Sequence, residues 1–154
     1  MNIFFDVDYT ILSADWTLRR HTVEVFARLV EDGHQVHVWS GEGKRYKVIK
    51  DHGLEPYVTG VFAKPIVDYA NGLRRYGVDP VPDFIIDDYP QIVEFFGGYH
   101  IKDFYLKRDD DDEIETVYQV ICEQMATGAS TNPRWRAKHP EFDAHVAAAL
   151  AVVE

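Results

Sequence analysis

Short apolar runs alternate along most of the chain with segments whose apolar positions recur at helical spacing. The apolar runs are rich in β-branched and aromatic residues and fall at 3–7, 35–39, 57–62 and 83–86, with a further candidate at 100–106. Each of the first four runs is followed by a segment with helical periodicity. This alternation predicts an α/β fold with a right-handed, doubly wound parallel sheet.

Glycine and proline delimit the expected helices. These helices fall at 21–33, 44–52, 65–77 and 90–96. Gly33, Gly53 and Gly77 are typical of helix ends, and Pro65 and Pro90 are typical of helix starts. The signals divide this part of the chain into strand and helix units of about 20 residues.

The C-terminal part of the chain has a different, mainly helical pattern. The acidic run Asp109 to Glu113 favours a helix start and is interpreted as a solvated cap rather than a metal site. Apolar residues from Ile114 to Met125 then form one helical face, in which Cys122 is expected to be buried. A last, alanine-rich helix is expected over 141–153.

Composition bounds the size of the protein and its partners. With 154 residues, of which 46% are hydrophobic, the chain can bury one core. We therefore expect a single domain over 1–154, with a catalytic core at about 1–106 and a C-terminal helical extension at about 107–154. The formal charge of −10 argues against a broad basic face, so nucleic acid is an unfavourable partner.

The sequence indicates neither a membrane nor an oxidising compartment. The first residues include acidic positions where a signal peptide would be apolar, and no stretch approaches the roughly 20 apolar residues of a membrane span. A single cysteine cannot form an intramolecular disulfide. We expect a cytoplasmic protein with no membrane partner.

Residues that carry chemistry stand where the predicted strands end. They comprise two carboxylate pairs, a serine followed by glycine, and a lysine: Asp6 and Asp8, Asp87 and Asp88, Ser40 and Gly41, and Lys64. The carboxyl ends of parallel strands meet at one edge of a sheet, and ligands bind there in open α/β sheets. We therefore expect these side chains to lie together.

The paired carboxylates favour a divalent cation. Carboxylates held close together repel one another, and Mg²⁺ takes oxygen ligands while it keeps positions for water and for a substrate phosphate. For Asp6 and Asp8 alone, the alternative is that Asp8 begins a turn that Asp6 caps. The complete set favours phosphoryl transfer, because it offers an oxygen nucleophile, a proton donor, hydroxyl and amide donors, a fixed cation and a metal site.

In this order and spacing, the motifs resemble those of the haloacid dehalogenase-like phosphatase superfamily. The matches are Asp6, Asp8 and Thr10 for its Asp-x-Asp-x-Thr motif, Ser40 for its strand-terminal Ser or Thr, Lys64 for its lysine before a helix, and Asp87-Asp88 for its acidic pair. The resemblance covers roughly the first 106 residues. It implies a three-layer, Rossmann-like core.

The resemblance also implies a phosphatase that forms an aspartyl-phosphate. Asp6 would be the nucleophile, and Asp8 would act first as general acid and then as general base. An acid at Asp8 favours hydrolysis of phosphate esters over dehalogenation. Thr10, Ser40 and the Gly41 amide would bind phosphoryl oxygens.

The resemblance further implies a lysine cation and a bound Mg²⁺. Lys64 would neutralise charge on the phosphoryl group and on Asp6. The Mg²⁺ ligands would be Asp6, the Asp8 carbonyl, Asp87 and, directly or through water, Asp88.

Two features bear on access to this site. Tyr9 replaces the glycine often found in the first motif, so a non-glycine conformation is expected there. The segments between the motifs are too short for a cap domain, so a capless, open site is expected. Open members act on large substrates, use a neighbouring subunit as a lid, or close with a local loop. Residues 12–19 are a candidate loop, although packing accounts for Trp16 equally well.

Two other functions remain open. One is a phosphoacceptor signalling domain, although its acidic pair and acceptor aspartate occur in a different order. The other is a catalytically silent binding module with the same fold. The substrate is expected to be a phosphorylated small molecule or protein, and the alanine-rich last helix would permit a homodimer. The basic residues Lys44, Arg45 and Lys47 are interpreted as a solvated helix face.

Overall fold

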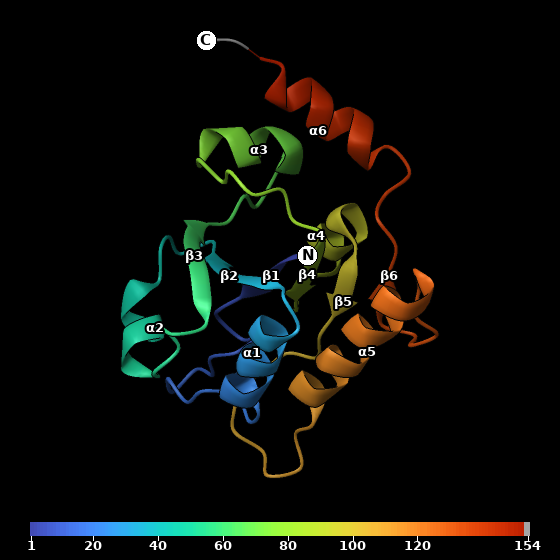
Figure 1. Cartoon of the computed structure of the whole chain (residues 1–154). Helices are drawn as coiled ribbons and strands as arrows, with labels where there is room; N and C mark the ends of the chain where they lie inside the picture. Colours follow the sequence, from blue (N-terminus) through green and yellow to red (C-terminus); the bar gives the residue numbers. More distant parts are fainter. Residues whose placement is uncertain (153–154) are drawn as a thin grey trace.

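The computed structural model describes residues 1–152 and shows one six-stranded sheet with helices around it (Figure 1). The strand order is β3-β2-β1-β4-β5-β6, and every neighbouring pair is parallel except β5 and β6. The strands are β1 (Asn2–Asp6), β2 (Gln35–Ser40), β3 (Val58–Ala63), β4 (Phe84–Asp87), β5 (Gly98–His100) and β6 (Trp135–Arg136). The α/β class is therefore confirmed, and the order is compatible with a Rossmann-like fold.

Six helices accompany the sheet in the described part of the chain. They are α1 (Thr22–Glu31), α2 (Tyr46–Asp51), α3 (Tyr69–Arg75), α4 (Pro90–Phe96), α5 (Glu113–Thr127) and α6 (Phe142–Leu150). Helices α1, α2 and α4 fall inside their predicted ranges. The predicted last helix ends at 153, a position that lies outside the described residues.

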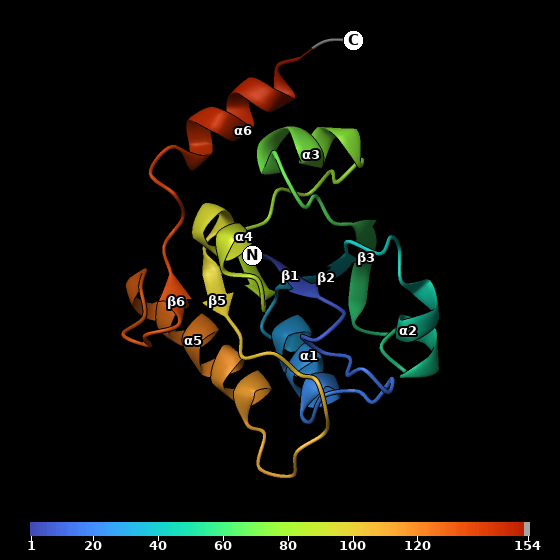
Figure 2. The ribbon, with the colours of Figure 1, turned by 180° about the vertical axis from the view of Figure 1, so that it is seen from behind.

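The central strand β1 buries both of its faces in apolar clusters. In β1, Ile3 and Phe5 belong to one cluster, together with residues of α1, α2 and α5, whereas Phe4 belongs to a second cluster with residues of α3, α4 and α6. This follows from the two-residue period of a strand. Helices α3 and α6 lie side by side in both views of the molecule (Figures 1 and 2).

Helix α3 begins later than predicted. The sequence favoured a start at Pro65, but the helix starts at Tyr69, after Asp68 in a left-handed conformation with φ 49°. A Cβ added at Gly72 would lie 2.3 Å from the Pro65 Cβ, so the proline packs against the helix instead of opening it. Ile66 and Val67 are consequently left exposed.

The fifth strand was predicted in the wrong place. A strand was expected over 100–106, but β5 occupies 98–100, and the following residues leave the sheet. Gly98 has φ 144°, and a Cβ there would lie 2.0 Å from the Ile85 carbonyl oxygen. This close approach of β5 to β4 requires glycine at position 98.

Strand β6 was not predicted. It pairs antiparallel with β5 through Gly98 and Arg136 and through Tyr99 and Trp135, so the C-terminal segment supplies an edge strand as well as helices. Two residues are too few for a recognisable alternation of apolar and polar positions.

The expectation for Cys122 was wrong, because this side chain is exposed. The buried face of α5 consists of Ile114, Val117, Val120 and Ile121. Each residue of an α-helix is turned by about 100° from the one before it. Cys122 therefore points away from the face to which Ile121 belongs.

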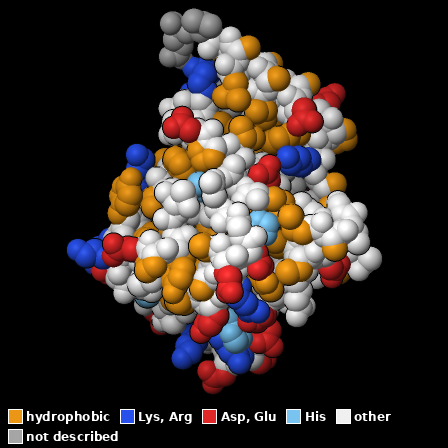
Figure 3. Space-filling view, in the orientation of Figure 1, with side chains coloured by type: hydrophobic (Ala, Val, Ile, Leu, Met, Phe, Trp, Pro, Cys, Tyr) orange, Lys and Arg blue, Asp and Glu red, His pale blue; other side chains and the backbone are white. Residues whose placement is uncertain are grey.

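Charged side chains of both signs gather at the lower end of the molecule in Figure 3, beside the loop before α5. Arg20 and His21 lie near the Asp112 carboxylate there, at 3.4 and 3.5 Å. The interpretation of the acidic run as a solvated helix start holds for Asp112, but Asp111 is buried against Arg19. Within residues 1–152, none of the helices combines the length and apolarity needed to cross a membrane.

Candidate functional site

Four strand ends meet at one edge of the sheet. Asp6 is the last residue of β1, Ser40 of β2 and Asp87 of β4, and Lys64 directly follows β3. The parallel register aligns Ser40 with Ala63, and the Lys64 amide donates to the Ser40 carbonyl at 2.9 Å. The structure therefore brings these side chains together as the sequence predicted.

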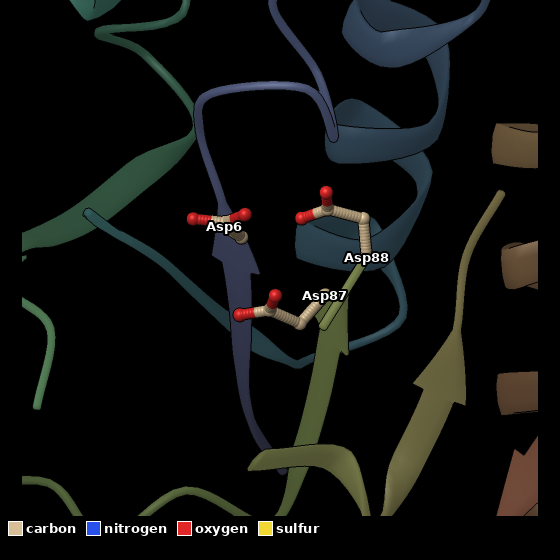
Figure 4. Close-up of side chains that lie close together, drawn as sticks. All are labelled: Asp6, Asp87 and Asp88. Carbon is tan, nitrogen blue, oxygen red and sulfur yellow. The ribbon is translucent and has the colours of Figure 1, made fainter. Parts of the chain in front are cut away.

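Three carboxylates form the centre of this edge. Asp6, Asp87 and Asp88 each place an oxygen within 4.8 Å of the other two, at the ends of β1 and β4 (Figure 4). Lys64 Nζ lies 3.1 Å from Asp6 Oδ1 and 2.9 Å from Asp87 Oδ2. One lysine cannot balance three ionised carboxylates, so the group would have a net negative charge if all three were ionised.

Burial makes that charge costly. It raises the pKa of Asp6 well above the usual value, and the neighbouring Asp87 raises it further, while Lys64 opposes both effects. Burial likewise raises the pKa of Asp87 to about 6, against the lowering influence of Lys64. For Lys64, burial lowers the pKa, but the two carboxylates outweigh it and the net shift is upward. The group therefore favours an additional cation or a bound proton.

The donor set fits a hard divalent ion such as Mg²⁺. All three candidate side chains offer carboxylate oxygens, two of them are buried, and the group faces an open cavity from which water and a phosphate oxygen can complete the coordination. The Asp8 carboxylate lies outside this group. Its predicted ligand atom is the backbone carbonyl oxygen, and that contact stays a prediction.

A tight turn after β1 separates Asp8 from Asp6. The Val7 carbonyl accepts the amides of Thr10, Ile11 and Leu12 at 3.2, 3.1 and 3.0 Å. Tyr9 adopts the left-handed conformation with φ 63°, so the expectation of a non-glycine conformation there was wrong. This strained conformation is supported by the Phe104 amide, which donates to the Tyr9 carbonyl at 2.7 Å.

Asp8 belongs to a second group of side chains. Its Oδ2 accepts the Ser40 hydroxyl at 2.9 Å and Arg45 Nη1 at 2.5 Å. The Arg45 guanidinium lies 5.3 Å from the centre of the Trp16 ring, which gives the predicted loop a contact with the site. Arg45 is mostly buried, so its assignment to a solvated helix face was wrong. Lys47 is solvated, with 76% of its side chain exposed.

Most of the predicted site residues line one open cavity of about 380 Å³. They are Asp6, Asp8, Ser40, Gly41, Lys64, Asp87 and Asp88. Ser40 Oγ also accepts the Glu42 amide at 3.0 Å, which fixes the turn that presents Gly41 to the cavity. The arrangement places hydroxyl, amide and ammonium donors around the space next to the carboxylates.

Thr10 is the predicted site residue that lies behind the cavity. It is fully buried, and its hydroxyl donates to Asp6 Oδ2 at 3.1 Å, with a longer contact of 3.5 Å to Asp88 Oδ1. The structure thus gives Thr10 a contact that orients Asp6. Its predicted contact with a phosphoryl group stays a prediction.

Sequence reasoning missed the role of Arg19, which was taken as part of a polar loop. This buried side chain donates to the carbonyls of Thr10 at 3.1 Å and Lys102 at 2.8 Å, and to Asp111 Oδ2 at 2.8 Å. It ties the turn after β1 to the loop before α5. Only the three-dimensional structure shows these contacts, because the partners are distant in the sequence.

The chain matches no protein-family model, and searches of curated proteins and of solved structures likewise give no match. The residues of the site are therefore what points to a function.

Proposed function

We propose that this protein is a Mg²⁺-dependent phosphatase that hydrolyses phosphate monoesters through an aspartyl-phosphate at Asp6. The proposal includes the three-layer, capless core of the haloacid dehalogenase-like superfamily and a cytoplasmic setting. One observation carries it. Asp6 stands in a buried carboxylate group with Lys64, at the floor of a cavity that Ser40 and Gly41 also line.

In the first step, an Asp6 oxygen attacks phosphorus and the bond from phosphorus to the ester oxygen breaks. Asp8 lines the same cavity, and its protonated form, which the second step regenerates, gives the proton to the leaving oxygen, so the alcohol departs neutral. Lys64 and the Gly41 amide stabilise the charge on the phosphoryl oxygens, and the Ser40 hydroxyl joins them when it exchanges its Asp8 acceptor for a phosphoryl oxygen.

In the second step, water attacks the phosphorus of the aspartyl-phosphate. Asp8 accepts the proton of that water, the bond from Asp6 to phosphorus breaks, and inorganic phosphate leaves with Asp6 restored. Asp6, Asp87 and Asp88 would hold the Mg²⁺, which supplies positive charge opposite the phosphoryl oxygens. Thr10 keeps Asp6 in position through its hydrogen bond.

The direct test measures phosphate release from an aryl phosphate with Mg²⁺ and with a chelator. We expect turnover only with Mg²⁺, and its loss in Asp6→Asn. The matched control is Asp79→Asn, the same chemical change at an exposed position outside the cavity, which should leave turnover intact. A folded parent protein inactive on a range of phosphate esters would contradict the proposal and favour the silent binding module.

A further inference from the structure

Apolar side chains surround the charged floor of the cavity. Tyr9, Ile66 and Tyr89 all line it, and they are exposed to 39%, 64% and 57%. We call these three residues the apolar rim. Large apolar side chains gathered around a polar site are typical of surfaces that bind a ligand.

The apolar rim stands directly next to the groups that would bind phosphate. Tyr9 follows Asp8, and Tyr89 follows Asp88 and donates its amide to Asp87 Oδ1 at 2.9 Å. Ile66 packs against the turn after β2, as shown by the 3.2 Å that would separate a Cβ added at Gly41 from the Ile66 Cγ2. A group attached directly to the bound phosphate would therefore meet these side chains.

We propose that the substrate is a small aromatic phosphate monoester, whose ring packs within the apolar rim while its phosphate occupies the charged floor. This inference rests on the proposed function. The floor offers Lys64 and a metal site for the phosphate dianion, and the rim offers two aromatic rings and an aliphatic side chain for the ester group. The cavity of about 380 Å³ is in the usual range for small ligands.

The other charged groups at the cavity disfavour more polar esters. Glu42 lines it beside Gly41, and Asp8 lines it beside Tyr9. Both carboxylates would repel a second phosphate, such as that of a nucleoside diphosphate. A sugar ester would place hydroxyl groups against Ile66 and the tyrosine rings, where apolar contact is lost.

The test compares benzyl phosphate with ethyl phosphate, whose alcohols are of similar acidity, so that the chemical step is nearly matched. We expect kcat/KM to be at least about tenfold higher for the benzyl ester. Tyr89→Ala and Ile66→Ala should each reduce this ratio severalfold. The control Tyr76→Ala removes a tyrosine that is 48% exposed outside the cavity and should leave the ratio unchanged.

Binding separates this inference from the proposed function. Calorimetry with benzylphosphonate and ethylphosphonate, which are not hydrolysed, should show at least about tenfold tighter binding of the benzyl compound. Equal rates for both esters would overturn the inference and leave the phosphatase standing. If neither ester is hydrolysed but benzylphosphonate still binds more tightly than ethylphosphonate, the phosphatase proposal alone is overturned. If the two phosphonates bind equally, or neither binds, the inference of an aromatic substrate is overturned. Much faster hydrolysis of a phosphotyrosine peptide than of benzyl phosphate would overturn the assignment to a small molecule.

Discussion

Asp6 and Asp8 are two residues apart, yet the structure places them in opposite surroundings. Asp6 is buried among Asp87 and Asp88, with Lys64 as the shared cation. Asp8 lies outside that group, with 30% of its side chain exposed, and is paired with Arg45. We refer to these as the Asp6 group and the Asp8 group.

The two proposed chemical roles of Asp6 and Asp8 rest on this difference in surroundings. Two carboxylates act differently when their environments differ, and pairs of this kind are where nucleophile and proton-transfer roles divide. In the Asp6 group, the excess negative charge favours an additional cation or a bound proton. In the Asp8 group, the carboxylate is already balanced by an arginine and oriented by the Ser40 hydroxyl. The turn at Tyr9 produces the separation.

The largest effect should come from removing the ammonium group of Lys64, which is shared by Asp6 and Asp87. In Lys64→Met we expect phosphatase activity to fall by at least about 100-fold. Without Mg²⁺, the free energy of unfolding at pH 8 should fall by about 3 kcal/mol, because buried carboxylates lose their partner. Urea unfolding and phosphate release measure these two changes. Lys47→Met is the matched control, since its ion pair with Asp51 is exposed and should contribute little. An equal loss of stability in Lys64→Met and Lys47→Met would contradict the special role of Lys64 among the buried carboxylates.

Removal of the metal should affect the Asp6 group next most strongly. Mg²⁺ at 100 times its dissociation constant should raise the free energy of unfolding by about 2.7 kcal/mol. A chelator should reverse this, and Asp87→Asn should abolish it, because the carboxylate group loses a ligand. Thermal unfolding with and without Mg²⁺ measures the effect. Stabilisation by Mg²⁺ that survives in Asp87→Asn would place the metal elsewhere.

His37 is a buried residue that belongs to neither the Asp6 group nor the Asp8 group, and its protonation gives a separate test of what burial costs. Burial lowers the pKa of His37 to about 4, and its Nε2 lies 3.1 Å from the Asn2 Oδ1. In the unfolded chain His37 is protonated below a pH of about 6.5, whereas in the folded chain it is protonated only below a pH of about 4. The free energy of unfolding is therefore unaffected by this histidine above a pH of about 6.5 and decreases as the pH falls from there toward 4.

We expect this loss to amount to about 2 kcal/mol at pH 5 relative to pH 8. The raised pKa values of the Asp6 group act in the opposite direction, because their protonated forms are favoured in the folded state. Urea unfolding of the parent and of His37→Gln at both pH values isolates the histidine contribution. An identical pH dependence in the two proteins would contradict it.

The smallest effect should follow from loosening the Asp8 group. In Arg45→Gln we expect kcat to fall by about tenfold, because Asp8 loses a charged partner that fixes its position. Arg45→Lys should recover part of the loss, and stabilisation by Mg²⁺ should be unchanged in both variants. The control is Arg75→Gln, whose partner Asp68 is exposed. Loss of Mg²⁺ stabilisation in Arg45→Gln would show that the two groups are not independent.

The residues of the Asp6 group, and Ser40 of the Asp8 group, could be predicted because they stand at the ends of strands or directly after them. The apolar runs before Asp6, Ser40, Lys64 and Asp87 identify four strands, and parallel pairing is enough to bring their ends together. The strand order and the register did not have to be known for that inference.

The contacts of the Asp8 group could not be predicted in the same way. Arg45 reaches Asp8 from the residues before α2, and Arg19 reaches Thr10, Lys102 and Asp111 from a loop. No periodic pattern relates these partners, since their contacts depend on the paths of loops. The left-handed Tyr9 was missed for a related reason, because support from Phe104 overrides its local preference.

The most direct test of the two roles is to trap the phosphoryl group on the protein. Asp8→Asn should still form the aspartyl-phosphate from an aryl phosphate with Mg²⁺, because an aryl leaving group needs little protonation, but water should attack it slowly without the base. After acid quenching, peptide mass spectrometry should find one added phosphoryl group on Asp6, and Asp6→Asn with Asp8→Asn should show none. A phosphoryl group on another residue, or its absence from Asp8→Asn while the parent turns over, would contradict the account.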